Sequence, residues 1–419
     1  MRYIVLGAAL WLGACELKAA PVTEYVGGQW WTGTDFVSDT RYVRDGEFVD
    51  PLSHAAETRV SLAGRFMIPP LADAHLHNLS GTQSTFATLS ELRRDGIVYA
   101  VSLGDSAKGR RASLACERHT GSADIVRSNG MITSPGGHPV MNYEAQALGK
   151  QGWSLTDDDR EMIAEAPVFA QDVYWTAQSA ADIRAMEAAY IAQQPDIVKV
   201  IIFGDRGVDD ETLHAVVSMA ARHDRRVFAH INDAKDLERA IDAGVDALAH
   251  ISGYDTGAPV SKALIARLAE TDIAVIPTLA RQLAMEPFVP PQYRLSETDR
   301  QTLEAGHARI LNDLIQAEVT VLPGFDLNGG TALDEILYWI RIGAVTAEEA
   351  LMIATKNAPQ HLFPDRTVGC LEIGCEASFI ALTADPRQDM RRVRTAMSAL
   401  IFKGAAIPTA LPACDQIAL

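Results

Sequence analysis

Short apolar runs alternate with segments of helical periodicity through the middle of the chain. Each run is typical of a strand that is buried on both faces. The runs cover residues 67–78, 97–103, 123–128, 197–203, 226–231, 247–251, 273–279 and 319–326. Helical patterns accompany them at 89–95, 180–194, 210–223, 234–243, 303–317, 334–343 and 346–357. This alternation favours an α/β fold, specifically a TIM-like (β/α)8 barrel, with an open doubly wound sheet as the alternative.

The two ends of the chain have a different pattern. Residues 24–64 are β-rich and are broken by Gly-Gly and Asp-Gly turns, and residues 369–403 are β-rich again. Neither end could bury much apolar surface alone, so we expect them to pair in one small β-sandwich. The expected domains are a barrel of residues 66–365 and a composite β-sandwich of residues 21–65 plus 366–419.

The first twenty residues have the pattern of a targeting segment. Arg2 precedes an apolar run at 4–12 that is too short to span a bilayer. The run ends in Leu-Gly-Ala-Cys15, which resembles the cleavage box of bacterial lipoproteins. We therefore expect export, with Cys15 lipidated and the protein periplasmic or anchored to a membrane surface. Cleavage as an ordinary signal peptide is the alternative.

Composition narrows the classes of partner. The formal charge of −17 and the pI near 5.1 argue against a nucleic-acid partner. The sequence has no Walker loop and no Gly-x-Ser-x-Gly or His-Glu-x-x-His motif. We expect a small-molecule substrate, and a homo-oligomer stays open.

Four cysteines remain if Cys15 serves as the anchor, and an exported protein can form disulfides from them. They allow three pairings, and the sequence does not choose among them. A local bridge between Cys370 and Cys375 is one arrangement, and free buried thiols are the other.

Metal-capable side chains lie in or at the end of five of the expected strands. In a barrel the carboxyl ends of the strands converge on one mouth, so residues far apart in sequence meet there. Two histidines at positions i and i+2 of a strand also point to the same side. The candidates are His75, His77, Lys199, His230, His250 and Asp326. Taken singly, the later histidines could be core residues, and Asp326 could cap a turn.

Lys199 is the hardest of these to explain as a structural residue. Its neighbours at 198 and 200–202 are apolar, so its ammonium would lie in a low dielectric without a partner. Burying it unpaired costs several kcal/mol. A neutral lysine can instead take up carbon dioxide and become a carbamate, which is an oxygen ligand able to bridge two cations.

The order of these residues resembles that of the amidohydrolase superfamily of metal-dependent hydrolases. The lysine places the chain near members that resemble Xaa-Pro and Xaa-Arg dipeptidases or imidazolonepropionase. The motifs that carry the resemblance are Asp73-Ala-His-Leu-His77, residues 242–250, Pro323-Gly-Phe-Asp326, and residues 347–357 and 368–377. Pro69-Pro70 departs from the usual Pro-Gly, and Cys375 and Ser378 replace a usual Lys and Asp, all away from the expected metal site.

The resemblance implies a role for each candidate. His75, His77 and Asp326 would hold one divalent ion, taken to be zinc, and His230 and His250 a second. Carboxylated Lys199 would bridge the two ions, which share a hydroxide, and Asp326 would carry the proton to the leaving group. The implied activity is hydrolysis of amide C–N bonds. A lactone or ester hydrolase, or a metal-binding lipoprotein without catalysis, are the alternatives.

Loops that follow the strands should select the substrate. The candidates for substrate contact are His138, Tyr174, Arg206 and Tyr254. A surface turn for His138, simple packing for Tyr174 and a surface ion pair for Arg206 are the alternatives.

Overall fold

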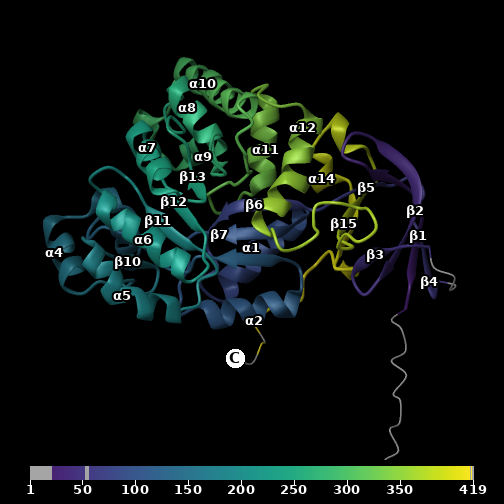
Figure 1. The fold of residues 1–419 in the computed structure, drawn as a ribbon, viewed down its shortest axis with the longest axis horizontal. Coiled ribbons are helices and arrows are strands. Elements are labelled where there is room, and N and C mark those ends of the chain that lie inside the picture. The colour runs from purple at the N-terminus through teal and green to yellow at the C-terminus, as the bar shows by residue number, and fades with distance from the viewer. Residues whose placement is uncertain (1–20, 52–55, 416, 418–419) are drawn as a thin grey trace, which may run out of the picture.

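The computed structural model describes residues 21–51, 56–415 and 417, and Figure 1 shows its α/β architecture. A helix-rich body occupies most of the view, and strands from both chain ends lie at one side of it. The expected targeting segment and Cys15 lie outside the described residues. Within the described residues, no helix is long and apolar enough to cross a membrane.

The body contains two parallel sheets. A three-stranded sheet has the order β6-β7-β8, and a six-stranded sheet has the order β10-β9-β11-β12-β13-β14. Their bounds are β6 Leu71–Leu76, β7 Ile97–Ser102, β8 Asp124–Arg127, β9 Met131–Thr133, β10 Tyr174–Thr176, β11 Val198–Ile201, β12 Val227–His230, β13 Ala247–Ala249 and β14 Ala274–Ile276. Every residue of β6, β7 and β11 to β14 is buried, which explains their continuous apolar sequences.

The expected third strand, 123–128, is β8, and a strand that was not expected, β9, follows it directly in the other sheet. β8 pairs with β7, whereas β9 pairs with β10 and β11. Between them Asn129 has φ 53, a left-handed conformation that redirects the chain. The carbonyl of Arg127 nevertheless accepts hydrogen bonds from the backbone N–H groups of Asp196 and Ile197, just before β11. The two sheets are therefore hydrogen-bonded to each other on this side.

The expected eighth strand, 319–326, is not a regular strand. It keeps one parallel bridge, between Val275 and Val321, and its Pro323 has no N–H to donate. The Leu322 N–H donates to the Val275 carbonyl at 2.8 Å, and the Ala74 N–H donates to the Pro323 carbonyl at 2.8 Å. The segment is thus hydrogen-bonded to β14 on one side and to β6 on the other.

Helices follow most of the strands. They are α1 Thr82–Arg94, α2 Arg110–Thr120, α3 Val140–Ala147, α4 Asp157–Glu165, α5 Ala180–Ala192, α6 Asp210–Arg222, α7 Ala234–Ala243, α8 Lys262–Ala269, α9 Ala280–Met285, α10 Glu297–Gln316, α11 Ala332–Arg341, α12 Ala347–Met352, α13 Ala358–Leu362 and α14 Arg392–Thr395. A π-helical segment, Ile353–Asn357, joins α12 to α13. Side chains such as Asp209 and Asp233 cap the first turns of α6 and α7, so these helices begin where the sequence indicated.

Strands from the two ends of the chain form one eight-stranded sheet. Its order is β17-β16-β15-β5-β1-β2-β3, with β4 also paired to β1. The bounds are β1 Thr23–Trp31, β2 Phe36–Arg44, β3 Glu47–Val49, β4 Thr58–Ser61, β5 Phe66–Ile68, β15 Phe379–Leu382, β16 Met397–Phe402 and β17 Ala405–Ile407. The pairing of β5 with β15 joins the ends.

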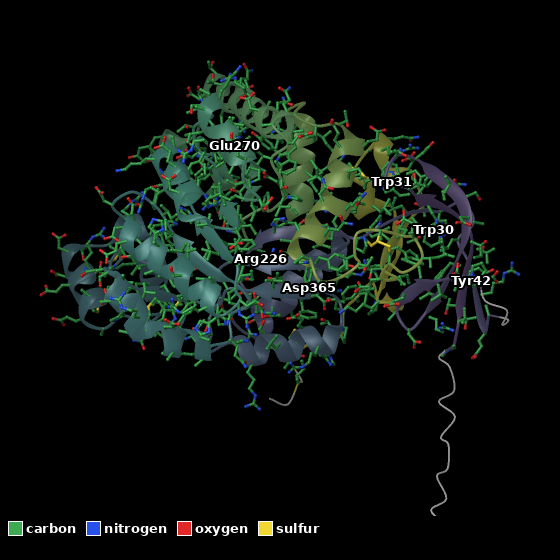
Figure 2. All side chains as sticks on the ribbon, viewed as in Figure 1. Trp30, Trp31, Tyr42, Arg226, Glu270 and Asp365 are labelled. Carbon is green, nitrogen blue, oxygen red and sulfur yellow. A yellow bond between two sulfur atoms is a disulfide. The ribbon has the colours of Figure 1, made fainter. Side chains whose placement is uncertain are left out.

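Aromatic side chains fill the inside of this sheet, where Figure 2 labels Trp30. The ring of Phe379 in β15 lies 5.2 Å from that of Trp30 and 6.1 Å from that of Phe48 in β3. In a flat sheet β3 and β15 would be about 19 Å apart, four strand spacings. The sheet is therefore strongly curled, and β3 and β15 face each other across an aromatic core.

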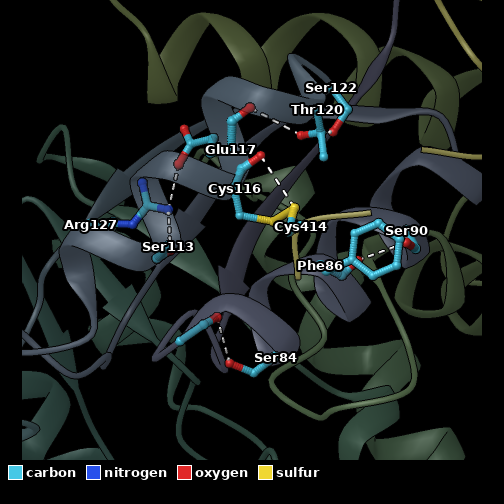
Figure 3. Close-up of a disulfide and its surroundings, with 11 residues drawn as sticks. Ser84, Phe86, Ser90, Ser113, Cys116, Glu117, Thr120, Ser122, Arg127 and Cys414 are labelled. Carbon is cyan, nitrogen blue, oxygen red and sulfur yellow. Dashed lines mark hydrogen bonds and ion pairs between the residues drawn. A yellow bond between two sulfur atoms is a disulfide. The ribbon is translucent and has the colours of Figure 1, made fainter. Parts of the chain in front are cut away.

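Two disulfides are present. The local bridge between Cys370 and Cys375 is confirmed. The second joins Cys116 of α2 to Cys414 near the chain end, across 298 residues; both cysteines are buried, and Figure 3 shows the bond between them. It fastens the C-terminal segment to the helix-rich body.

Candidate functional site

All six candidate metal ligands line one cavity of about 600 Å³. It lies at the carboxyl ends of the parallel strands, where His75 belongs to β6 and His77 directly follows it, Lys199 belongs to β11, and His230 ends β12. His250 follows β13, and Asp326 ends the irregular segment 319–326. The structure therefore brings together residues that are up to 251 positions apart, from 75 to 326.

Three donor atoms meet at the centre of the cavity floor. The Nε2 atoms of His75 and His77 lie 3.1 and 2.8 Å from the same carboxylate oxygen, Oδ1 of Asp326. The two nitrogens are 3.2 Å from each other. The Nε2 atom of His250 lies 3.7 Å from the other oxygen, Oδ2. His75, His250 and Asp326 each place a donor atom within 4.8 Å of the others.

His230 lies next to this group. Its ring centroid is 4.6 Å from that of His250 and 4.6 Å from that of His138. Its Nε2 atom is buried without a hydrogen-bonding partner among the described residues. The structure thus places His230 and His250 side by side, next to the cluster at Asp326.

The backbone at two candidate ligands is strained. His250 has φ 74 and Asp326 has φ 56, in the left-handed region that residues other than glycine seldom adopt. Gly324, two residues before Asp326, packs so tightly that a Cβ atom there would lie 2.7 Å from the Cβ of His75. Only glycine allows segment 319–326 to approach β6 this closely. The local sequence therefore determines how Asp326 reaches the histidines.

Burial sets the protonation of the candidate ligands. It lowers the pKa of His75 to about 4 and holds the pKa values of His230 and His250 well below the usual range. Burial alone would raise the pKa of Asp326, but His75, His77 and Arg281 outweigh it and hold that pKa well below its usual range. At neutral pH His75, His230 and His250 are neutral and Asp326 is ionised, which is the state that binds metal.

Lys199 is buried, as its neighbours predicted, with 2% of its surface exposed. Its Nζ atom has no hydrogen-bonding partner among the described residues. Burial lowers the pKa of Lys199 to about 7, and the charge of Asp326 only partly opposes this. A substantial fraction of this lysine is therefore a neutral amine near neutral pH.

This arrangement fits a bound cation better than a hydrogen-bonded cluster. No assignment of protons lets the Nε2 atoms of His75 and His77 satisfy both each other and the shared oxygen of Asp326. If both Nε2 atoms carried a hydrogen, the two N–H groups would collide. If neither carried one, two lone pairs would face a carboxylate. A cation at the point where they converge would accept all three donors at once. His75, His77 and Asp326 could therefore hold a metal ion, and the donor atoms of His75, His250 and Asp326 also lie close enough together to hold one.

Neighbouring side chains orient two of the histidines. His250 Nδ1 lies 2.5 Å from the hydroxyl of Thr278, and that hydroxyl donates to the Pro277 carbonyl at 2.8 Å. His250 must then donate from Nδ1, which leaves Nε2 as an acceptor facing Asp326. The carboxylate of Asp73 accepts from the His75 backbone N–H at 3.0 Å and from the Ala332 N–H at 2.8 Å.

Two of the four expected substrate contacts line the cavity. His138 does so, and burial lowers its pKa to about 4, so its ring is neutral. Tyr254 does so as well, and its ring stacks on His250 with centroids 4.5 Å apart.

The other two lie outside the cavity lining. The buried hydroxyl of Tyr174 donates to Oε1 of Glu144 at 2.6 Å, so the packing alternative describes this residue. Arg206 is exposed, and its guanidinium stacks on Phe203 at 3.9 Å from the ring centroid. The expectation that these two side chains contact the substrate therefore has no support in the geometry.

The cavity also contains residues that the sequence did not suggest. Arg281 lies five residues after β14, and its Nε is 2.8 Å from Oδ2 of Asp326. Tyr143 and Phe169 reach the cavity from the long insertion between β9 and β10. All three lie in segments that follow strands. A search of every such segment for charged and aromatic residues, including the one after the seventh strand, would have found them.

Comparison with known proteins identifies the family. A family model described as "Amidohydrolase family" matches residues 164–406, more than half of the chain. The matched region contains Lys199, His230, His250 and Asp326, and it ends within β17. Ochratoxinase of Aspergillus niger is 31% identical over 188 residues, 43% of this chain. That alignment spans only 37% of the fungal enzyme.

Solved structures share the fold over nearly the whole chain. A putative prolidase from Bifidobacterium longum has a TM-score of 0.71 and 18% identity, covering 93% of this chain and 95% of its own. A Xaa-Pro dipeptidase solved with bound methionine has a TM-score of 0.72 and 19% identity, covering 92% and 99%. The fold is common to all of them, and the family model adds the sequence evidence. The chain belongs to the amidohydrolase family.

Proposed function

We propose that this chain is a metal-dependent hydrolase that cleaves the C–N bond of amides. The observation that carries the proposal is the convergence of His75, His77 and Asp326, with donor atoms 2.8–3.2 Å apart, in a cavity that Lys199, His230 and His250 also line. Membership of the amidohydrolase family supports the same chemistry.

We further propose that eight strands, β6, β7, β8, β11, β12, β13, β14 and segment 319–326, form one closed (β/α)8 barrel. The hydrogen bonds of segment 319–326 to β14 and β6, and those of the Arg127 carbonyl at the start of β11, support closure on both sides. Residues 21–65 and 366–419 then form the composite β-sandwich domain, and 66–365 the barrel. The curled aromatic core around Phe379 supports this division.

The donor set suits two divalent ions, most simply zinc. His75, His77 and Asp326 would hold one, and His230 and His250 the other. Lys199 would bridge them after its neutral amine adds to carbon dioxide, forming an N–C bond and releasing one proton. Its unpartnered, buried Nζ supports this step. Bound divalent ions of this kind acidify a water molecule and polarise a carbonyl group.

The residues of the chain then have distinct tasks. The ionised carboxylate of Asp326 accepts a proton from the attacking water as the water oxygen bonds to the carbonyl carbon. It returns that proton to the amide nitrogen when the C–N bond breaks, which gives a carboxylic acid and an amine. The neutral ring of His138 can donate a hydrogen bond to the substrate carbonyl. Tyr254 covers one face of His250 and helps to exclude water.

We also propose that the protein is exported and held at a membrane surface by a lipid on Cys15. The two disulfides support an oxidising compartment. A small molecule is the proposed substrate, and the acidic net charge of −17 argues against nucleic acid.

A hydrolysis screen tests the function. Purified chain, loaded with zinc and carbonate, is incubated with dipeptides, N-acyl amino acids, simple esters and lactones, and the released amines or acids are quantified. Amide turnover that chelation removes and zinc restores is expected. Hydrolysis of esters or lactones without any amide would contradict the proposal, as would amide turnover that survives complete chelation.

A further inference from the structure

The cavity has two chemically different walls. One wall comes from residues 131–173, which are β9 and the insertion between β9 and β10, and its apolar surface belongs to Met131, Pro139, Tyr143, Phe169 and Val173. The exposed Asn142 and Gln146 accompany them. The facing wall, after β14, carries Arg281.

The sheet order places these walls on either side of the candidate ligands. β9 and β14 are separated by β11, β12 and β13. Those three strands lead to Lys199, His230 and His250. A molecule whose reacting bond lies over the candidate ligands would therefore extend toward the apolar wall in one direction and toward Arg281 in the other.

Arg281 is the one cation of the lining that solvent reaches readily. The other lysine or arginine in the described lining is Lys199, which is 2% exposed, whereas 31% of the Arg281 side chain is exposed. Asp326 is the one carboxylate of that lining. The chain as a whole has a net charge of −17, yet this arginine faces a cavity that has only one carboxylate in its described lining. The single carboxylate of the lining is paired with Arg281 itself, so no second acidic group of the lining opposes an anionic ligand.

The guanidinium retains donors for such a ligand. Its Nε lies 2.8 Å from Oδ2 of Asp326 and 3.2 Å from the Asp326 carbonyl oxygen. Among the described residues, neither terminal nitrogen of Arg281 has a hydrogen-bonding partner. Those nitrogens form the planar edge that binds a carboxylate through two parallel hydrogen bonds.

Both walls are fixed by buried glutamates. Glu335 accepts hydrogen bonds from the backbone N–H groups of Leu279 and Ala280, each at 2.7 Å, directly before Arg281. Glu144 accepts from the N–H groups of Val168 and Phe169, each at 2.9 Å. The spacing between the cationic and the apolar wall is therefore set before a ligand binds, which lowers the entropic cost of binding.

We propose that the substrate is an N-acyl amino acid, with its carboxylate bound by Arg281 and an apolar aryl or alkyl acyl group packed against Phe169 and Tyr143. This inference rests on the proposed function, because it names the substrate of that same site. The cavity volume of about 600 Å³ is within the range that holds a molecule of this size.

The test separates recognition of the carboxylate from hydrolysis. The probes are ketone analogues of N-benzoyl-L-phenylalanine and of N-benzoyl-L-phenylalaninol, in which CH2 replaces the scissile N–H. Calorimetry measures their binding to the zinc-loaded full chain, and the ratio of the two dissociation constants reports the carboxylate. The wild type should bind the acid at least about tenfold more tightly than the alcohol.

Variants assign the preference to one side chain. In Arg281→Met the ratio should fall below about two, and in Arg281→Lys it should be intermediate. Arg206→Met, which removes the exposed arginine outside the cavity lining, should leave the ratio unchanged. Thermal unfolding of each variant checks that it is folded. If Arg281→Met does not fold, Arg281→Lys still tests the proposal.

The outcomes distinguish this inference from the proposed function. Equal binding of the two probes by the wild type would overturn the inference, as would no binding of either. Loss of the ratio in Arg206→Met but not in Arg281→Met would also overturn it. A preserved, Arg281-dependent preference in a chain that hydrolyses no amide would support carboxylate recognition and contradict the hydrolase.

Discussion

The hydroxyl oxygen of Thr278 lies 2.5 Å from Nδ1 of His250 and so fixes which ring nitrogen faces the Asp326 carboxylate. Thr278 is fully buried and has φ 50, an unfavourable conformation for a β-branched residue. A strained residue that contacts a candidate metal ligand suggests that the contact is needed for function rather than for stability.

We predict that Thr278→Val weakens metal binding by about 10- to 100-fold, because His250 loses the acceptor that orients its ring. Thr278→Ser, which keeps the hydroxyl, should restore affinity. The measurement is a titration of the metal-free protein with cobalt(II), followed by its visible absorption spectrum. Equal affinity and identical spectra in the valine variant would show that Thr278 has only a structural role.

The carboxylate of Asp326 is predicted to be essential for turnover. In Asp326→Asn the proton acceptor is lost, and kcat should fall by at least about 100-fold while the fold is retained. Circular dichroism and the metal content of the variant separate this effect from misfolding. Turnover at the wild-type rate would rule out the role of Asp326 as proton carrier.

Acid should destabilise the protein partly through His307. This buried ring contacts the Tyr338 hydroxyl at 2.6 Å and the Tyr254 carbonyl at 2.8 Å, and burial lowers its pKa to about 4. The unfolded chain takes up this proton near pH 6.5, but the folded protein does so only near pH 4. The stability that neutral His307 contributes is therefore present above pH 6.5 and is lost as the pH falls toward 4.

The expected size of this effect is about 2 kcal/mol between pH 7 and pH 4.5. Urea unfolding at both values should show a smaller pH dependence for His307→Gln than for the wild type. The exposed His214 of α6 provides the matched control, and His214→Gln should keep the full dependence. Identical pH dependence in the wild type and His307→Gln would refute the assignment.

The disulfide between Cys116 and Cys414 should contribute more to stability than the one between Cys370 and Cys375. The first closes a loop of 298 residues and the second a loop of 5. The loop-entropy model gives about 6 kcal/mol for the long loop and about 2 kcal/mol for the short one, as upper values. Urea unfolding of the two double-alanine variants measures the difference. A larger loss for the short-range pair would contradict the prediction.

The sequence predicted the elements that depend on local pattern. The expected bounds agree with the structure for strands such as β7 and β12 and for helices such as α6 and α7. Apolar periodicity and capping residues act within a few positions, so the local sequence is enough to predict them. The ligand candidates were found because each lies in or directly after a buried run. Lys199 was the most informative, since an unpaired lysine among apolar neighbours needs an explanation.

Tertiary contacts decided the features that the sequence could not give. The irregular course of segment 319–326 depends on how closely Gly324 approaches His75. The pairing of Cys116 with Cys414 depends on where the C-terminal segment crosses α2. Tyr174 begins β10 and Arg281 follows β14, and their contacts with Glu144 and Asp326 determine that only Arg281 faces the cavity.

The number of divalent ions that the chain retains tests the central claim most directly. The chain is loaded with zinc and carbonate, freed of excess metal by gel filtration and analysed by mass spectrometry for metals. We predict about two ions per chain for the wild type and for His214→Ala, and about one or none for the double variant His75→Ala/His77→Ala. A wild-type chain that retains no divalent ion under these conditions would contradict the account.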